Sequence, residues 1–308
     1  MTATAAARAS ADANSEPDLT PDVAPDVAHD VIDTDRYPLH RPDSPEYREL
    51  VARCRHQAAE EGCVVIKGFV RPDALKRMEA ESEALAPTAH YNDTYTNPYN
   101  SADDPSLPDD HPKRIFADRT NAFVAGDTIG ADTEIRRLYH DKAVQQLVAD
   151  CLGVAQVYEY ADPLAGLVVN VLQPNCQHPW HFDTNEFIVT MMTKQPEAGG
   201  SFDYVPGIRS PEDENFEAVS EVVRGNHDRV KSLDVQAGDL QIFFGRYSLH
   251  RVSRVQGQRE RHTLILGYAK EPGVIGKAER TRKLFGRVAP VHEQEAERAP
   301  NRSDKLSD

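Results

Sequence analysis

The second half of the chain is built from short apolar runs at close spacing, and this limits the folds open to it. From Ala155 onward, Gly, Pro and Asn separate runs that are rich in Val, Ile, Phe and Tyr, among them VYEYA, GLVVNVL, EFIVTMMT, LQIFFG and RHTLILGYA. Short runs with turn residues between them are typical of β-strands in a sandwich or barrel. The sequence therefore predicts a β-rich second half.

Three helical patterns precede these strands. The first begins at Ser44, a suitable N-cap that comes before Pro45, and its apolar stripe ends at Gly62. A buried strand, CVVIKGFV, follows, and then a second helix over RPDALKRMEAESEALA. We expect a third helix over residues 132–152. Helices followed by many short strands predict an α+β fold.

Composition divides the chain into one domain with two extensions. Residues 1–36 are rich in Ala, Asp, Pro, Ser and Thr without an apolar period, which predicts a disordered leader. Residues 291–308 are similarly polar, and we expect a flexible tail there. Residues 37–290 contain neither a repeat nor a linker and are expected to form a single domain. Within it, residues 88–126 are rich in Asn, Asp, Pro and Tyr, which favours a long lid or binding loop.

Charge, hydropathy and cysteine spacing argue against several classes of protein. The 50 acidic and 35 basic residues give a formal net charge of -15, the opposite of a surface that binds nucleic acid. The apolar runs are far shorter than the roughly 20 residues needed to span a membrane, and no secretory signal is recognisable. The four cysteines lack CxxC spacing, so neither disulfides nor a cysteine zinc site is expected. We expect a cytoplasmic protein that acts on a small molecule and that can form a homodimer.

The stretch HPWHFDTNEF, residues 178–187, contains a pattern that suits a metal ion. His181 and Asp183 are two positions apart at the start of an expected strand, and alternate residues of a strand lie on one face. The natural third ligand is His250, in the later run YSLHRV. Two imidazoles and one carboxylate leave three positions open on an octahedral ion, which is the arrangement of non-haem Fe(II) oxygenases.

Arg261 follows His250 by eleven residues and supplies a second component of such a site. 2-Oxoglutarate would chelate Fe(II) through its C1 carboxylate and keto oxygen, and its distal carboxylate would then need a fixed cation. A guanidinium on a core-facing strand offers it bidentate hydrogen bonds. Thr263 shares a strand face with Arg261 and can add a hydroxyl. These residues predict Fe(II) as the cofactor, with 2-oxoglutarate and O2 as co-substrates.

The order of these motifs resembles that of the Fe(II)/2-oxoglutarate-dependent dioxygenases. It comprises H-x-D, a GG pair, GD, HRV and an R-x-T strand, and the resemblance spans about residues 45–270. The stretch PWHFDTNEFIVTMMTKQPEAGGSFDYVP is similar to the branch that contains radical halogenases and hydroxylases of free amino acids. The resemblance implies a double-stranded β-helix (jelly-roll, cupin-like) core with flanking N-terminal helices. In the halogenases of this branch a small residue replaces the carboxylate ligand and chloride fills the gap, so the presence of Asp183 implies hydroxylation.

The resemblance also indicates residues that contact the substrate. It suggests that His178 and Arg119 bind a substrate carboxylate. Asp162 and Glu159 precede a core strand and could pair with a substrate ammonium, although an acid in so acidic a chain ordinarily lies in solvent. We expect the substrate to be a free polar or cationic L-amino acid. Hydroxylation of one of its unactivated C–H bonds would be coupled to the release of succinate and CO2.

Two other functions would use parts of the same pattern. A zinc-dependent hydrolase or isomerase on a cupin-like barrel would use the same three ligands but would have no need of Arg261. A non-catalytic binding protein would keep the fold without the chemistry. We expect structural roles for Trp180, which should pack in the core, and for His262, which should point away from Arg261.

Overall fold

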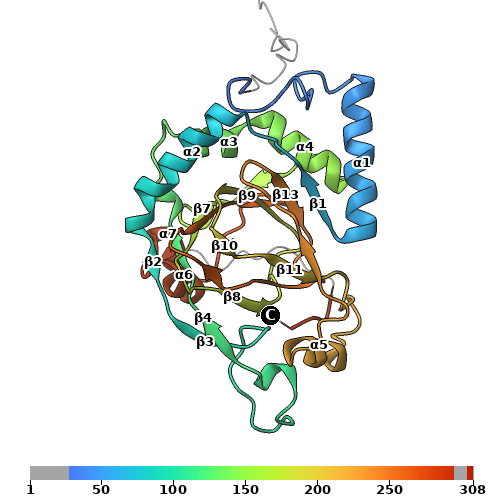
Figure 1. Ribbon diagram of the computed structural model, residues 1–308, viewed down its shortest axis with the longest axis vertical. Helices are drawn as coiled ribbons and strands as arrows, with labels where there is room; N and C mark the ends of the chain where they lie inside the picture. The colour runs from blue at the N-terminus through green and yellow to red at the C-terminus, as the bar shows by residue number, and fades with distance from the viewer. Residues whose placement is uncertain (1–27, 295–303, 308) are drawn as a thin grey trace, which may run out of the picture.

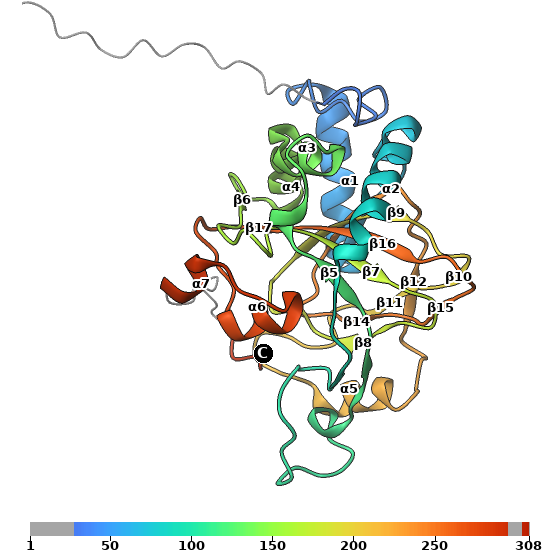
Figure 2. The ribbon, with the colours of Figure 1, turned by 90° about the vertical axis from the view of Figure 1, so that its left-hand side faces the viewer.

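Two antiparallel β-sheets form the core of the protein. The computed structural model describes residues 28–294 and 304–307. The larger sheet contains, in spatial order, β1 (Cys63–Ile66), β13 (Leu240–Phe243), β9 (Ile188–Lys194), β16 (Arg261–Leu266), β7 (Leu167–Leu172), β5 (Ala122–Val124) and β2 (His90–Tyr91). The smaller sheet contains β12 (Lys231–Leu233), β11 (Phe202–Val205), β14 (Leu249–Val252) and β8 (His178–His181). The two sheets lie one above the other (Figure 2).

The chain alternates between the sheets. Strands β7, β9, β13 and β16 lie in the larger sheet, and β8, β11, β12 and β14, which lie between them in sequence, form the smaller one. This alternation is the double-stranded β-helix that the motif order implied. Three two-stranded ribbons complete the β-structure: β10 (Ala198–Gly199) with β15 (Val255–Gln256), β17 (Tyr268–Ala269) with β6 (Tyr158–Glu159), and β3 (Thr94–Thr96) with β4 (Ala117–Arg119).

Helices cover the outer face of the larger sheet (Figures 1 and 2). They are α1 (Pro45–Glu61), α2 (Pro72–Leu85), α3 (Glu134–His140) and α4 (Lys142–Leu152), and their apolar side chains share one buried cluster with the sheet. A strand covered on both faces is mostly apolar, and all six residues of β7 are buried, with Asn170 as the polar one. The remaining helices are α5 (Phe216–Val223), α6 (Ala278–Phe285) and α7 (Pro290–Gln294), with 3-10 turns at Ala86–Thr88, Pro112–Arg114 and Gly126–Thr128.

The first two predicted helices are confirmed, and the third is divided in two. The Ser44 side chain caps α1 by accepting a hydrogen bond from the Tyr47 amide, and Gly62 ends the helix in the left-handed conformation. The predicted helix over residues 132–152 is interrupted at Asp141, whose backbone is extended. Its carboxylate accepts from the amides of Ala143 and Val144 at 2.8 and 3.0 Å and so begins a new helix.

The predicted leader is too long at its C-terminal end. Residues 1–27 lie outside the described residues, but residues 28–36 are packed against the domain. Val31 and Ile32 are fully buried, and Ile32 forms a β-bridge with Val70. Two adjacent apolar residues in a polar segment do not form the periodic pattern of a helix or a strand. Their burial in the core, with Ile32 bridged to Val70, is seen only in the folded structure.

The predicted flexible tail also contains packed residues. His292 lies in α7 and is buried, and Asp304 forms an ion pair with the buried Arg246. Residues 295–303 and 308 lie outside the described residues.

The predicted loop over residues 88–126 includes four short strands, of which β2 and β5 extend the larger sheet. Strands of two or three residues are too short to show a period. Among the described residues, no helix combines the length and the apolar character needed to cross a bilayer.

Candidate metal centre

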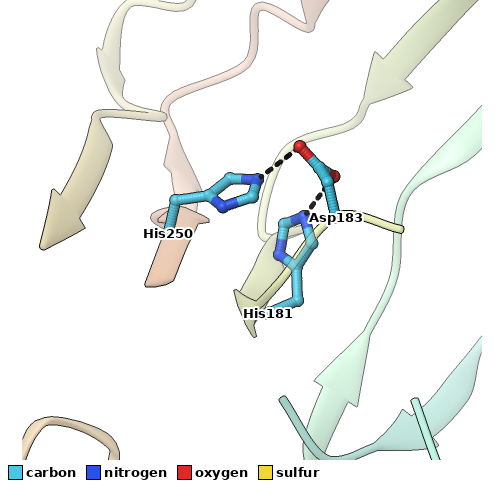
Figure 3. A group of neighbouring side chains, drawn as sticks. All are labelled: His181, Asp183 and His250. Carbon is cyan, nitrogen blue, oxygen red and sulfur yellow. Dashed lines mark ion pairs between the residues drawn. The ribbon is translucent and has the colours of Figure 1, made fainter. Parts of the chain in front are cut away.

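His181, Asp183 and His250 meet at one point between the sheets (Figure 3). His181 ends β8 and is the direct cross-strand partner of His250 in β14, so the two rings lie with their centroids 4.0 Å apart. The Nε2 atom of His181 lies 3.8 Å from Oδ1 of Asp183, and the Nε2 atom of His250 lies 3.5 Å from Oδ2. When one ligand atom is taken from each of the three residues, these atoms all lie within 4.8 Å of one another. Three donors at this separation can share one ion.

Hydrogen bonds fix the ring orientation of both histidines. Nδ1 of His181 lies 2.8 Å from the carbonyl oxygen of Pro179, and Nδ1 of His250 lies 3.0 Å from that of Ser248. Each Nδ1–H therefore donates to a carbonyl two residues earlier, which leaves the Nε2 lone pair directed at the centre. Burial, and then the neighbouring His250, hold the pKa of His181 well below its usual range. A neutral imidazole is the form that binds metals.

The Asp183 carboxylate is held close to both rings without a donor for one of its oxygens. Its amide donates to the Gly245 carbonyl at 3.1 Å, which fixes the backbone after β8. Among the described residues, nothing donates to the buried Oδ2 atom. A buried carboxylate oxygen without a partner is costly, and a cation would satisfy it. Two imidazoles and a carboxylate suit Fe(II), so the residues present fit the metal.

Arg261 is a buried cation without a carboxylate partner among the described residues. It is the first residue of β16 and is 4% exposed. One guanidinium nitrogen donates to the Thr263 hydroxyl, as strand alternation predicts, and Nε has no partner. Burial lowers its pKa to about 10. Gly200 passes close by in the left-handed conformation, and a Cβ there would lie 3.0 Å from Cδ of Arg261. The unpaired guanidinium fits the distal carboxylate of 2-oxoglutarate.

Comparison with known proteins places the chain in a family. Residues 47–283 match the family model described as halogenase D. The chain belongs to this family. No curated protein matches it significantly.

Solved structures are similar to this family member at low sequence identity. AviO1 from Streptomyces viridochromogenes is 16% identical with a TM-score of 0.50, over 71% of this chain and 94% of that one. An oxidoreductase of the 2OG-Fe(II) oxygenase family from Burkholderia pseudomallei (16% identity, TM-score 0.47) matches over 72% and 92%. A prolyl hydroxylase from Trichoplax adhaerens (16%, 0.48) matches over 77% and 92%.

The halogenase D match, the jelly-roll core and the His-Asp-His centre agree on one class of enzyme. The protein is a 2-oxoglutarate-dependent non-haem iron dioxygenase, with Fe(II) as its cofactor and 2-oxoglutarate and O2 as co-substrates.

In this halogenase D family member, both residues suggested to bind a substrate carboxylate lie beside the metal centre. The His178 ring stacks on His181 with centroids 3.7 Å apart. Arg119 ends β4, and the amide of Thr120, the next residue, donates to the Gln177 carbonyl at 3.1 Å, just before β8. Burial and the nearby Arg280 lower the pKa of Arg119 to about 10, while Asp183 opposes that change.

The two acids suggested to bind a substrate ammonium are engaged elsewhere. Both oxygens of the buried Asp162 are occupied: one accepts from the amides of Leu164 and Ala165, and the other accepts from Gly276 and lies 2.9 Å from His292 Nε2. Glu159 accepts from Gln145 at 2.6 Å and lies 2.9 Å from His140 Nδ1, at the junction of α3 and α4. These contacts give both acids protein partners and lend no support to the predicted substrate contacts.

Sequence reasoning missed Arg280, in α6. Its guanidinium donates to the hydroxyl of Thr184, which directly follows Asp183. In the sequence it lies in AERTRKLF, where alternating charges resemble an ordinary exposed helix.

The predictions for Trp180 and His262 are confirmed. Trp180 is buried under the Arg251 guanidinium, and His262 faces α2, where its Nδ1 lies 3.1 Å from the Ser82 hydroxyl.

Proposed function

We propose that this protein hydroxylates a C–H bond of a small carboxylate-bearing substrate, a free amino acid. The observation that carries the proposal is the Asp183 carboxylate, which lies 3.8 and 3.5 Å from the two imidazole Nε2 atoms. Halogenases of the related branch have a small residue at this position, and chloride takes the place of the carboxylate. Here the side chain itself fills that position, so oxygen transfer is the outcome that we expect.

Each group of residues has a separate task in this proposal. His181, Asp183 and His250 hold Fe(II), and Arg261 with Thr263 holds the distal carboxylate of 2-oxoglutarate. The chemistry supplied by the bound cofactor is the oxidative decarboxylation of 2-oxoglutarate to succinate and CO2, coupled to attack on a substrate C–H bond. The protein contributes position: the bond held nearest the metal is the one that reacts.

The substrate carboxylate is proposed to lie between Arg119 and His178. Both side chains flank the centre. The Arg119 Nε atom donates a 3.0 Å hydrogen bond to the side-chain amide oxygen of the buried Asn121, and this bond fixes the orientation of the guanidinium. A fixed guanidinium can bind a carboxylate through paired hydrogen bonds. Preference for a cationic amino acid loses its support, because Asp162 and Glu159 are occupied by protein groups.

Both alternatives leave an observation unexplained. A zinc-dependent hydrolase or isomerase does not require a buried arginine such as Arg261, whose Nε atom has no hydrogen-bond partner. A binding protein without catalytic activity does not require the arrangement of His181, Asp183 and His250. Anaerobic addition of Fe(II) and 2-oxoglutarate should give the weak visible charge-transfer band of the bidentate chelate. Absence of the band in protein that has bound iron would contradict the proposed use of 2-oxoglutarate.

The reaction itself is tested by products. The twenty standard amino acids are incubated separately with the Fe(II) protein, 2-oxoglutarate, O2 and excess chloride, and succinate and product masses are recorded. We expect succinate together with a product that has gained one oxygen atom. A chlorinated product as the main species would show that Asp183 does not exclude chloride and would overturn the proposal of hydroxylation.

A further inference from the structure

Two guanidinium groups beside the metal centre have no carboxylate partner among the described residues. Arg119 bonds to the neutral Asn121 amide and lies over the Phe123 ring at 5.6 Å. Arg280 bonds to the neutral Thr184 hydroxyl. Elsewhere on α6, by contrast, Lys283 pairs with Glu279 at 2.8 Å. The chain has a large excess of acids, yet neither guanidinium is paired with one.

Both groups belong to one electrostatic environment. Arg280 reaches Thr184 from α6, and Arg119 approaches from β4, which contacts β8. The two guanidinium groups therefore reach the centre from different elements, one near Asp183 and one near His178. Arg280 also lowers the pKa of Arg119, after the larger effect of burial, which shows that their charges are close enough to repel.

The charges at the centre leave these two cations uncompensated. A divalent metal, the Asp183 carboxylate, dianionic 2-oxoglutarate and the Arg261 guanidinium cancel in formal charge, and imidazoles that bind a metal are neutral. Arg119 and Arg280 then remain as two positive charges. Arg119 is half-buried, so an uncompensated charge there is costly and an anionic ligand removes that cost, while Arg280, whose side chain is exposed, adds a positive charge beside Thr184. A cationic substrate would add to it.

We infer that the substrate is an acidic amino acid whose α-carboxylate is bound by Arg119 and His178 and whose side-chain acid is bound by Arg280. This inference rests on the proposed function and deepens it. Thr184 contributes by holding the Arg280 guanidinium at the edge of the centre. Charge therefore selects the substrate: glutamate or aspartate is preferred over the uncharged amide of the same shape.

The first test measures binding without turnover. The full-length protein is loaded with Mn(II) and 2-oxoglutarate, and glutamate, aspartate, glutamine, asparagine and lysine are titrated by calorimetry. Loss of a charge-assisted hydrogen bond typically costs a factor of about ten or more in affinity. We therefore expect glutamate or aspartate to bind at least about tenfold more tightly than its own amide. Equal or tighter binding of the amides, or tighter binding of lysine, would overturn the inference.

The second test assigns the preference to Arg280. In R280Q, the preference for the acid over its amide should fall about tenfold, while R280K should restore part of it. R282Q is the matched control, because Arg282 is an exposed arginine on the same helix. The charge-transfer band of the Fe(II) and 2-oxoglutarate complex should be unchanged in all three variants. A preference that persists in R280Q would overturn the role of Arg280.

Failure of the inference can be distinguished from failure of the proposed function. Succinate formation with lysine or an apolar amino acid, but not with glutamate or aspartate, would overturn the inference and leave hydroxylation in place. Tight, Arg280-dependent binding of glutamate or aspartate, with no succinate formed from any amino acid, would support the charge assignment and overturn the proposed hydroxylation.

Discussion

Gly245 lies so close to Asp183 that no side chain fits between them. A Cβ atom at position 245 would stand 1.9 Å from Oδ2 of Asp183 and 2.6 Å from its carboxylate carbon. The Gly245 carbonyl also accepts the Asp183 amide at 3.1 Å. The loop before β14 thus both positions the backbone of Asp183 and leaves room for its carboxylate beside the two histidines.

We predict that G245A weakens metal binding. The added methyl group must displace the Asp183 carboxylate, and changes to groups that orient a metal ligand typically cost about 10- to 100-fold in affinity. Titration of the apo-protein with Mn(II), followed by electron paramagnetic resonance, measures the effect. G130A is the control, since a Cβ at Gly130 would make only an ordinary 3.5 Å contact. Equal Mn(II) affinity in both variants would show that Asp183 is not a ligand.

R261Q should change 2-oxoglutarate affinity and protein stability in opposite directions. Loss of charged hydrogen bonds is expected to weaken 2-oxoglutarate binding roughly 100-fold while iron is still bound. In the absence of 2-oxoglutarate, removal of a buried cation without a counter-ion should stabilise the fold by about 1 kcal/mol, or roughly 2–3 °C in melting temperature. Calorimetric titration and thermal unfolding measure the two effects.

The control for R261Q is R259Q, which removes the guanidinium of a residue two positions away that pairs with Glu79 near the surface. It should leave 2-oxoglutarate affinity unchanged. Equal loss of iron and 2-oxoglutarate binding in R261Q would mean that Arg261 supports the metal ligands and is not the anchor.

D162N is expected to affect stability and not substrate binding. Asp162 and His292 are fully buried and lie 2.9 Å apart, so the substitution disrupts a buried pair and should lower the free energy of unfolding by about 2–3 kcal/mol. Urea unfolding measures this loss, with D132N as an exposed control. The KM values of the folded variant should equal those of the wild type. A large rise in the substrate KM at unchanged stability would restore Asp162 as a substrate ligand.

The stability of the protein should fall below about pH 6.5 in part through His262. Burial lowers the pKa of this imidazole, and its hydrogen bond to the Glu260 carboxylate is the second-largest effect and raises the pKa. Above pH 6.5 the imidazole is neutral in both the folded and unfolded states. Below pH 6.5 the imidazole is protonated in the unfolded state but stays neutral in the folded state. This difference lowers the free energy of unfolding by up to about 1.4 kcal/mol per pH unit.

The measurement is urea unfolding of the apo-protein at pH 7.5 and 5.5. In H262Q the difference between the two pH values should be smaller than in the wild type, whereas H56Q, at an exposed position in α1, should keep it. If H262Q and wild type lost the same amount of stability on acidification, burial of this histidine would not be the cause.

Local patterns were sufficient for much of the fold and for the metal centre. The Ser44 cap, the Gly62 stop and the apolar runs are properties of neighbouring residues, so the first helices and most core strands follow from them. Strand alternation predicted that His181 and Asp183 share a face, but β8 ends at His181, and Asp183 is held beside it through its amide bond to the Gly245 carbonyl. His250 was placed by motif order, and the cross-strand pairing of β8 with β14 gives the physical reason for it.

Other features depend on partners distant in the sequence. Asp141 divides the predicted third helix because its backbone is extended and its side chain caps the N-terminus of α4. Val31 and Ile32 are ordered by contact with residues near Val70, and His292 is ordered by contact with Asp162. No pattern within these segments signals such contacts, and for this reason the predicted leader and tail were both too long.

The sequence by itself determined the secondary structure that local preference controls, and it identified the side chains proposed to bind the metal and the cation proposed to bind 2-oxoglutarate. The tertiary structure decided which charged groups lie beside the metal centre: it paired Asp162 and Glu159 with protein groups and brought Arg280 to Thr184. Periodicity states which face of an element a residue occupies, but the sign of the charge in a pocket depends on which elements meet there, and that is a property of the packed chain.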